Sequence, residues 1–213
     1  MFRDRVDAGI QLGAALAVGL QGEPDASRVV LGIARGGVIV GAEVARALGV
    51  RLDVVIPRKL GAPGNHELGV GAVAPGVQVI DRNMTDALDV SEEFLARETA
   101  RQLAEIERRT LAYRGHRPPV DLHATTAIVV DDGVATGVTA IAALRWARAR
   151  GAAATIFAAP VGPVGVQERF APECDRCLVL HTPGNLRAVG QWYDMFDQTT
   201  DDEVRVALGE RSS

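Results

Sequence analysis

Five short apolar runs constrain the fold of this chain most strongly, because helical patterns lie between most of them. The runs occupy residues 29–34, 52–57, 127–132, 154–161 and 176–181. Continuous apolar runs are typical of strands that are buried on both faces, and their alternation with helices is typical of βαβ units. We therefore predict an α/β fold with a Rossmann-like parallel β-sheet that is flanked by helices.

Apolar residues at helical spacing predict the helices of this fold. The predicted helices span residues 4–18, 38–49, 91–115, 137–151 and 163–171, and the tail becomes helical from Thr200. The longest of them is amphipathic, with Ser91 as its cap, and we expect most of its charges to face solvent. The chain of 213 residues is predicted to be one domain, 1–213, with a core at about residues 20–180.

A glycine-rich stretch at residues 60–80 interrupts this pattern. It contains two strand-like pieces, residues 68–73 and 77–80, which are joined by the turn sequence APG. The pattern predicts a hairpin on a flexible loop. Within it, GVGAVA at residues 69–74 is similar to a dinucleotide-binding fingerprint. We reject that interpretation, because the run does not link a strand to a helix.

Composition and charge argue against several classes of protein. The net charge of −4 gives no sign of the basic face that general nucleic-acid binding needs. No apolar run reaches membrane-spanning length, and the first residues, MFRDRVDAGI, lack the apolar segment of a signal peptide. These features predict a cytoplasmic protein without a nucleic-acid or membrane partner. Cys174 and Cys177 form a single CxxC without a second ligand pair, so we expect a structural role and not a zinc site.

Two adjacent carboxylates end the third apolar run, in AIVVDDGVATGVTA at residues 127–140. Ligands of open α/β sheets bind at the carboxyl ends of strands, where the start of a helix directs N–H groups at an anion. Small residues would let a phosphate approach this turn, and Thr136 and Thr139 would add hydroxyl donors. Asp131 and Asp132 would repel that phosphate, so they must face another part of the ligand. Vicinal hydroxyls fit carboxylate oxygens, and the pattern therefore predicts a sugar phosphate.

The same residues resemble a known signature. IVVDDGVATGVT (128–139) is similar to the phosphoribosyl pyrophosphate (PRPP) motif of the type I phosphoribosyltransferases. GIARGGVIVGAEVARAL (32–48) resembles the pyrophosphate loop of that family, and PRKLG (57–61) carries basic residues where members often have a pyrophosphate-directed lysine or arginine. From residue 2 to about 140 the chain looks like a set of uncharacterised predicted members. They share FRDR, RGG, RKLGAPGN and VDDGxATGxT in this order.

The resemblance implies a fold and a set of site residues. The fold would be that of the type I family, with the flexible loop at 60–80 and a small hood at 181–213 that includes the N-terminal segment. The PRPP-binding residues would be Arg35, Gly36, Gly37, Arg58, Lys59, Asp131, Asp132, Gly133, Val134, Ala135, Thr136, Gly137, Val138 and Thr139. Without the resemblance, Arg58 and Lys59 would equally fit a solvated surface.

The resemblance also implies a reaction. A nitrogen nucleophile would displace pyrophosphate from C1 of PRPP, with Mg²⁺ as cofactor. Arg35, Lys59, Asp131 and Asp132 would be the catalytic residues, acting by positioning and charge stabilisation and not as nucleophiles. The two aspartates would hold the metal indirectly, through ribose hydroxyls or water. The loop at 60–80 would close over the site, and its His66 or Glu67 is either an acid or base or merely part of a polar tip.

The acceptor is expected to bind under the hood. Arg187, Trp192 and Tyr193 are the candidates there, since an aromatic ring can stack on a base. The alternative, that these residues fill a small core of their own, stays open. Family members that act on 6-oxopurines usually carry an aspartate directly before the Thr-Gly, where this chain has Ala135. That difference argues against hypoxanthine or guanine as the acceptor.

Several functional alternatives remain at this point. A PRPP or nucleotide sensor would keep the site without catalysis, and an enzyme could run the reaction in reverse. A receiver domain is disfavoured, because its acidic pair follows the first strand. A P-loop is excluded, since GVATGVT lacks the required lysine. Type I members are usually homodimers, so a homodimer is a further possibility.

Overall fold

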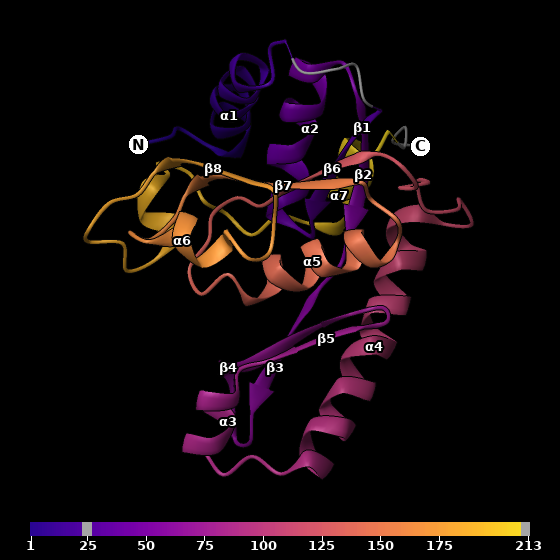
Figure 1. Ribbon diagram of the computed structural model, residues 1–213, viewed down its shortest axis with the longest axis vertical. Coiled ribbons are helices and arrows are strands. Elements are labelled where there is room, and N and C mark those ends of the chain that lie inside the picture. Colours follow the sequence, from indigo (N-terminus) through magenta and orange to yellow (C-terminus); the bar gives the residue numbers. More distant parts are fainter. Residues whose placement is uncertain (23–26, 210–213) are drawn as a thin grey trace.

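The computed structural model describes residues 1–22 and 27–209, and its centre is a five-stranded parallel sheet (Figure 1). The strand order is β2-β1-β6-β7-β8, and Arg28 of β1 lies opposite Thr126 of β6. The strands are β1 (Arg28–Ile33), β2 (Arg51–Val55), β6 (Thr126–Val130), β7 (Ala154–Val161) and β8 (Arg176–His181). The predicted α/β fold and all five predicted strands are confirmed.

Helices cover both faces of this sheet, as Figure 1 shows. Val30, Ile128 and Ala158 point toward α1 (Arg5–Gly19) and α2 (Gly36–Leu48) and belong to the same buried cluster as residues of both helices. Leu31, Val129 and Phe157 point the other way, toward α5 (Val138–Ala149) and α6 (Val166–Phe170). This alternation explains the continuous apolar runs, because every second side chain is buried on one face and its neighbours on the other.

A second lobe lies below this layer in Figure 1. It consists of β3 (Arg58–Ala62), β4 (Asn65–Ala74), β5 (Val77–Ile80), α3 (Arg82–Ala87) and α4 (Glu92–Arg114). The predicted hairpin is present as β4 and β5, but the sequence did not predict β3 or α3. The segment is more regular than a loop, since Leu60, Val70 and Ala72 are buried and β4 packs against α5. Its predicted flexibility stays a prediction.

Helix α4 joins this lobe to the parallel sheet. Ser91 caps it by accepting a hydrogen bond from the Phe94 N–H, as predicted. Leu95, Ile106 and Tyr113 are buried on its inner face. The expectation that its charges are mostly solvated is only partly right, because three polar residues of the helix are also buried. These are Glu98, Gln102 and Arg114.

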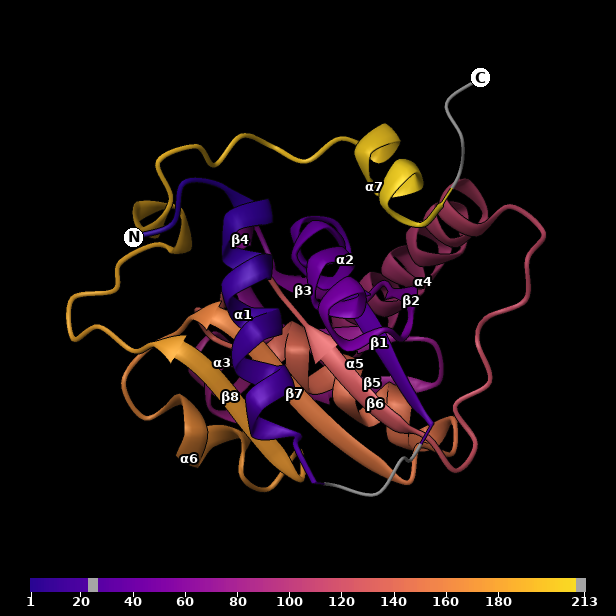
Figure 2. The same cartoon turned by 90° about the horizontal axis from the view of Figure 1, so that it is seen from above.

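The C-terminal segment passes over the N-terminal one, as Figure 2 shows. Phe2 donates its N–H to the Trp192 carbonyl at 2.8 Å and forms a bridge with Tyr193. The segment contains a short 3-10 helix, η1 (Val189–Trp192), and ends in α7 (Asp201–Ala207), which packs against α2 and α4. Across residues 1–22 and 27–209, none of the helices has the length and apolar character that crossing a bilayer requires.

Candidate functional site

The predicted site residues meet at one edge of the parallel sheet. Strands β2, β1 and β6 are neighbours, and Arg58, Arg35 and Asp131 follow their carboxyl ends. Parallel strands place these ends side by side, so three segments that are distant in sequence reach the same edge. The topology therefore brings the RGG, RKLG and VDDG motifs together.

Two of the helices that begin at this edge, α2 and α5, lack side-chain caps. No side chain within the described residues caps α2, which starts at Gly36, or α5, which starts after Gly137. By contrast, Asp4, Ser91 and Thr200 cap α1, α4 and α7. First-turn N–H groups without a side-chain partner are suited to an anionic ligand.

Two glycines bring the start of α2 against the acidic pair. A Cβ atom at Gly36 would lie 1.9 Å from Asp132 Oδ2, and one at Gly37 would lie 2.5 Å from the Val130 carbonyl oxygen. Neither distance leaves room for a methyl group. The glycines in RGG are therefore needed for the close approach of the pyrophosphate-type loop to Asp131 and Asp132.

Asp132 is held from both ends of the chain. Arg5 Nε donates to Asp132 Oδ2 at 2.7 Å, and the Tyr193 hydroxyl donates to the Asp132 carbonyl at 2.5 Å. The Arg5 guanidinium also donates to the Asp197 carbonyl at 2.7 Å and lies 3.9 Å from the centre of the Phe196 ring. The sequence did not predict Arg5, because nothing local in the sequence marks an ion pair between residues 5 and 132.

Asp131 interacts with the adjacent Asp132 through a hydrogen bond and through charge. Its Oδ1 accepts the Asp132 N–H at 2.9 Å. Burial and the adjacent Asp132 carboxylate raise the pKa of Asp131 well above its usual value. A cation near the two carboxylates would reduce this repulsion, so the pair fits a metal such as Mg²⁺ that is held through ribose hydroxyls or water. Within the described residues no group of three or more His, Cys, Asp or Glu could hold a metal by itself, so ligand oxygens and water would complete its coordination.

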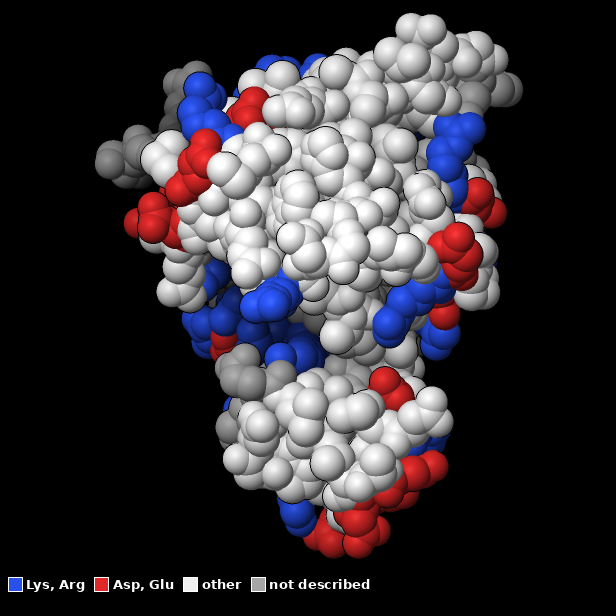
Figure 3. Space-filling view, turned by 90° about the vertical axis from the view of Figure 1, so that its left-hand side faces the viewer, with Lys and Arg blue, Asp and Glu red and all other residues white. Residues whose placement is uncertain are grey.

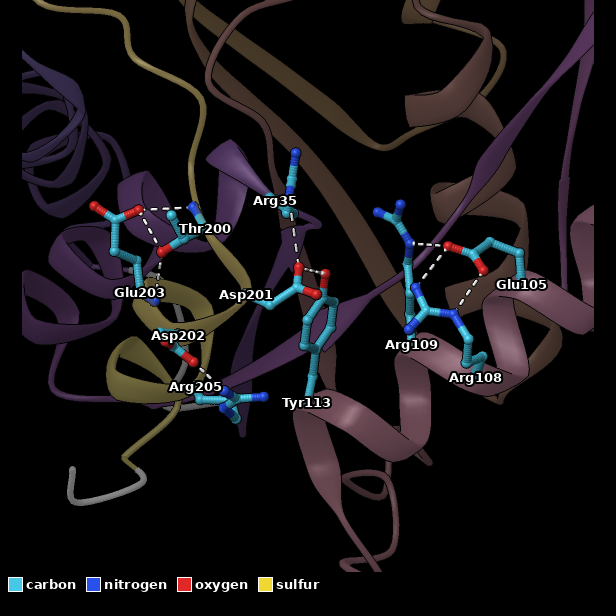
Figure 4. Close-up of polar contacts among 10 residues, drawn as sticks. All are labelled: Arg35, Glu105, Arg108, Arg109, Tyr113, Thr200, Asp201, Asp202, Glu203 and Arg205. Carbon is cyan, nitrogen blue, oxygen red and sulfur yellow. Dashed lines mark hydrogen bonds and ion pairs between the residues drawn. The ribbon is translucent and has the colours of Figure 1, made fainter. Parts of the chain in front are cut away.

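Arg35 points at the C-terminal helix (Figure 4). Its Nη1 lies 3.5 Å from Asp201 Oδ1, and the Tyr113 hydroxyl donates to the same oxygen at 2.7 Å. The start of α2, the end of α4 and the start of α7 therefore meet at one carboxylate. The peptide bond between Ala34 and Arg35 is cis.

Further basic side chains lie close to β3. Figure 3 shows Lys and Arg side chains gathered in a hollow between the layer of the parallel sheet and the second lobe. Arg58 Nε donates to Gln102 Oε1 at 2.9 Å, and burial together with the Arg109 charge lowers the pKa of Arg58. The Lys59 side chain crosses over Gly69, whose Cβ, if present, would lie 2.8 Å from Lys59 Cδ. Cations crowded in this way favour an anionic ligand.

Comparison with known proteins agrees with this geometry. Residues 5–169 match the family model described as a phosphoribosyl transferase domain. The chain belongs to the phosphoribosyl transferase family. The resemblance of its motifs to the type I members is thereby confirmed, and the match includes all the predicted PRPP-binding residues.

This phosphoribosyl transferase family member is similar to named mycobacterial proteins and to a solved bacterial structure. A protein provisionally named a phosphoribosyl transferase, from Mycobacterium tuberculosis strain H37Rv, is 43% identical over 205 residues, and one from strain CDC 1551 gives the same values. The match covers 96% of this chain but 45% of those proteins, so the chain spans about half of their length. The crystal structure of TT1426 from Thermus thermophilus is 40% identical, covers 97% of both chains and has a TM-score of 0.79.

The predicted acceptor residues separate into two sets. Arg187 and Trp192 line a cavity of about 370 Å³ together with Asn185 and Gln191. All four lining residues belong to the hood, and the hood touches the turn after β6, since a Cβ at Gly133 would lie 2.3 Å from Val189 Cγ1.

Tyr193 does not line this cavity as far as the structure describes it. The Tyr193 ring is buried, with its centre 5.4 Å from that of Phe2 and 4.8 Å from that of Phe196. Tyr193 thus supports Asp132 through its hydroxyl and packs in the core of the hood.

Two further predictions concern the His66–Glu67 pair and the CxxC motif. The side chains of His66 and Glu67 lie outside the described part of the structure, so their predicted role stays a prediction. Cys174 is buried, with its Sγ 3.4 Å from the Phe170 carbonyl oxygen, and both cysteines are free thiols. Burial raises the pKa of both thiols, that of Cys177 to about 12, which disfavours the thiolate that a redox motif needs.

Proposed function

We propose that this chain is a Mg²⁺-dependent phosphoribosyltransferase that uses PRPP as donor. It would transfer the 5-phosphoribosyl group to a nitrogenous base or amine and release pyrophosphate. One observation supports this most strongly: Gly36 and Gly37 hold an uncapped helix start against the Asp131–Asp132 pair. An anion site and a hydroxyl-binding site therefore lie side by side, as a ribose that carries a pyrophosphate requires.

Each part of PRPP has a chemically suited partner in this proposal. The 5′-phosphate would bind at the turn before α5, where Ala135 and Thr136 are exposed and no side chain within the described residues caps the helix. The ribose hydroxyls would bind Asp131 and Asp132, whose oxygens accept hydrogen bonds. The pyrophosphate would lie at the start of α2, near Arg35, with Arg58 and Lys59 of β3 as further cations.

The chemistry follows from charge and position. The acceptor nitrogen forms a bond to C1 while the bond from C1 to the pyrophosphate oxygen breaks, and its electron pair leaves with pyrophosphate. The proton on the nitrogen passes to solvent or to a base. Arg35 and Lys59 would stabilise the charge that develops on the leaving group, and a bound Mg²⁺ would neutralise part of it. Asp131 and Asp132 would orient the ribose.

The hood cavity supports a nitrogen heterocycle as the acceptor. Asn185 offers an amide donor and acceptor, and Trp192 offers a face for stacking. Gln191 offers its amide N–H donors, because its Oε1 already accepts the N–H groups of Arg187 and Ala188. These groups suit the edge and the face of a planar base. We retain Arg187 and Trp192 as proposed acceptor residues and assign Tyr193 to the support of Asp132. A cytoplasmic location and a homodimer also stay predictions.

Calorimetric titration of PRPP, with and without Mg²⁺, tests the donor. The Asp131→Asn/Asp132→Asn double variant should lose Mg²⁺-dependent binding, whereas Asp86→Asn, an exposed aspartate on α3, should bind as the wild type does. Bases and amines are then screened for pyrophosphate release. Absence of PRPP binding by the wild type would contradict the proposal. Binding without release for any acceptor would instead support a PRPP sensor.

A further inference from the structure

The contact between Arg35 and Asp201 adds a residue to the proposed PRPP site. Asp201 comes from α7, at the far end of the chain, and Arg35 comes from the loop that would bind pyrophosphate. Asp201 Oδ1 lies 3.5 Å from Arg35 Nη1 and accepts the Tyr113 hydroxyl at 2.7 Å (Figure 4). Asp201 Oδ1 is therefore paired with the Arg35 guanidinium and hydrogen-bonded to the Tyr113 hydroxyl.

Packing fixes the position of Asp201 in this contact. Tyr113 and Val204 are each 0% exposed, and both belong to the buried cluster that includes Val38 of α2. The start of α7 is further fixed by Thr200 and Glu203, whose side chains each bond to the backbone N–H of the other. Lifting α7 away would expose Val204 and break these bonds, so packing opposes movement of α7.

The surroundings of Asp201 favour its ionised form, which can pair with the Arg35 guanidinium. The hydrogen bond from Tyr113 lowers the pKa of Asp201, and the charges of Arg35 and Arg109 lower it further, against the effect of burial. An arginine has five N–H donors, and this ion pair involves one guanidinium nitrogen. Arg35 can therefore rest on Asp201 and still present donors to an anion.

We infer that Asp201, held by Tyr113, is a positioning residue that orients the Arg35 guanidinium for pyrophosphate. The inference rests on the proposed function. Arginine is long and loses rotamer freedom when it binds a ligand, so a fixed carboxylate reduces the cost of ordering it. Asp201 acts through Arg35 and contacts neither the ribose nor the acceptor.

Binding of inorganic pyrophosphate with Mg²⁺, followed by calorimetry, tests this role without any need for the acceptor. Asp201→Asn should weaken binding about fivefold, which is the upper range for a partly exposed ion pair. Tyr113→Phe should weaken it in the same direction. Asp202→Asn is the matched control, because Asp202 is the next residue of α7, is 80% exposed and pairs with Arg205. The pyrophosphate affinity of this variant should equal that of the wild type.

A double-mutant cycle separates positioning from a general structural role. In the Arg35→Ala background, Asp201→Asn should cause no further loss of pyrophosphate affinity, because the residue through which it acts is gone. Thermal unfolding of each variant identifies those that fail to fold, and Asp201→Asn, which keeps the shape of the side chain, decides the matter if Tyr113→Phe is unstable.

Three outcomes would overturn the inference. The first is an Asp201→Asn affinity equal to that of Asp202→Asn, and the second is an equal loss in both backgrounds. The third is tighter pyrophosphate binding by Asp201→Asn, which would mean that Asp201 competes with the ligand for Arg35. In each case the wild type still binds. A wild type that binds neither PRPP nor pyrophosphate would overturn the proposed function and this role with it.

Discussion

Asp132 shows how much a single residue of this site depends on distant parts of the chain. Its carboxylate is paired with Arg5, its carbonyl with Tyr193, and its Oδ2 would be only 1.9 Å from any Cβ at Gly36. The Arg5 and Gly36 contacts restrict the carboxylate, and the Tyr193 bond restricts the backbone of the same residue. A ligand that needs this carboxylate therefore meets a group that is already oriented.

Replacement of Gly36 by alanine tests that restriction. The added methyl group would collide with Asp132 Oδ2 and with Arg5 Nε, at 1.9 Å and 2.7 Å, so one of the two must move. We expect PRPP affinity to fall by at least about tenfold in a calorimetric titration. Gly184→Ala is the control, since nothing lies within 4 Å of a Cβ there, and its affinity should match that of the wild type. Equal affinities for both variants would show that the close approach is not required.

The tyrosines predict an unusual alkaline titration. The chain has two, Tyr113 and Tyr193. Burial and the Asp201 bond raise the pKa of Tyr113 to about 12, and burial also raises the pKa of Tyr193. The unfolded chain therefore loses its phenolic protons first, and stability falls as pH rises from about 10 to about 12. Phenolate absorbance should stay low at about pH 10 in the folded protein and rise on unfolding in urea. A normal tyrosine titration of the folded protein would contradict this.

The sequence predicted candidate site residues in contiguous motifs, which the fold brings to one edge of the sheet, and missed the residues from distant segments that contact them. RGG and VDDG carry their own signals, because small residues beside charges at strand ends have few structural explanations. Arg5, Tyr113 and Asp201 carry no such signal. Each is an ordinary residue of an amphipathic or polar segment, and only the packing of α1, α4 and α7 brings it to the site.

At the scale of elements, α4 owes its position to polar contacts at its C-terminal end. Arg114 donates to both carboxylate oxygens of Asp53, at 2.9 Å and 3.0 Å, and to the Val54 carbonyl. Asp53 also accepts the Val120 N–H at 2.9 Å. These bonds attach the helix that carries the second lobe to the edge strand β2.

Removal of the Arg114 side chain should therefore destabilise the protein strongly. Arg114→Ala leaves Asp53 as a largely buried carboxylate without its cation, and we expect a loss of about 3 kcal/mol in the free energy of unfolding. Arg97→Ala on the same helix breaks an exposed pair with Glu93 and should cost under about 1 kcal/mol. Urea denaturation measures both. Similar losses for the two variants would mean that α4 is held by its apolar face alone.

The elements themselves were largely predictable, and the exceptions have physical reasons. Strands β1, β2, β6, β7 and β8 are long apolar runs, and α1, α2, α4 and α5 have clear helical spacing. Strand β3 reads RKLGA, with charges and glycine in place of β-branched residues, and is formed by pairing with β4. Helix α3 has six residues, too few for a periodic pattern.

At the scale of the whole molecule, the hood is fastened by the start of the chain. Phe2 is 0% exposed and packs against Tyr193 and His181, with ring centres 5.4 Å apart in both cases. Its backbone pairs with Trp192 and Asp194. The proposed acceptor cavity thus depends on a segment that is about 190 residues away in the sequence.

Loss of the Phe2 ring should loosen the hood. Phe2→Ala is expected to reduce the free energy of unfolding by about 3 kcal/mol, because it leaves a cavity against Tyr193. Val18→Ala, at the exposed end of α1 and 67% exposed, should change it by less than about 0.5 kcal/mol. Thermal or urea unfolding compares the two. A Phe2→Ala variant as stable as Val18→Ala would mean that the hood closes without the N-terminal segment.

The cluster around Asp132 has a consequence for the evolution of this chain. Arg5, Gly36 and Tyr193 come from the N-terminal helix, the start of α2 and the hood, yet all three meet at Asp132 after β6. Arg5 and Gly36 lie against its carboxylate, and Tyr193 bonds to its backbone carbonyl. A larger residue at 36, or a loss of charge at 5, leaves the aspartate misplaced or unpaired. Homologues should therefore keep these four positions together or change them together, and substitutions at them should be correlated across the family.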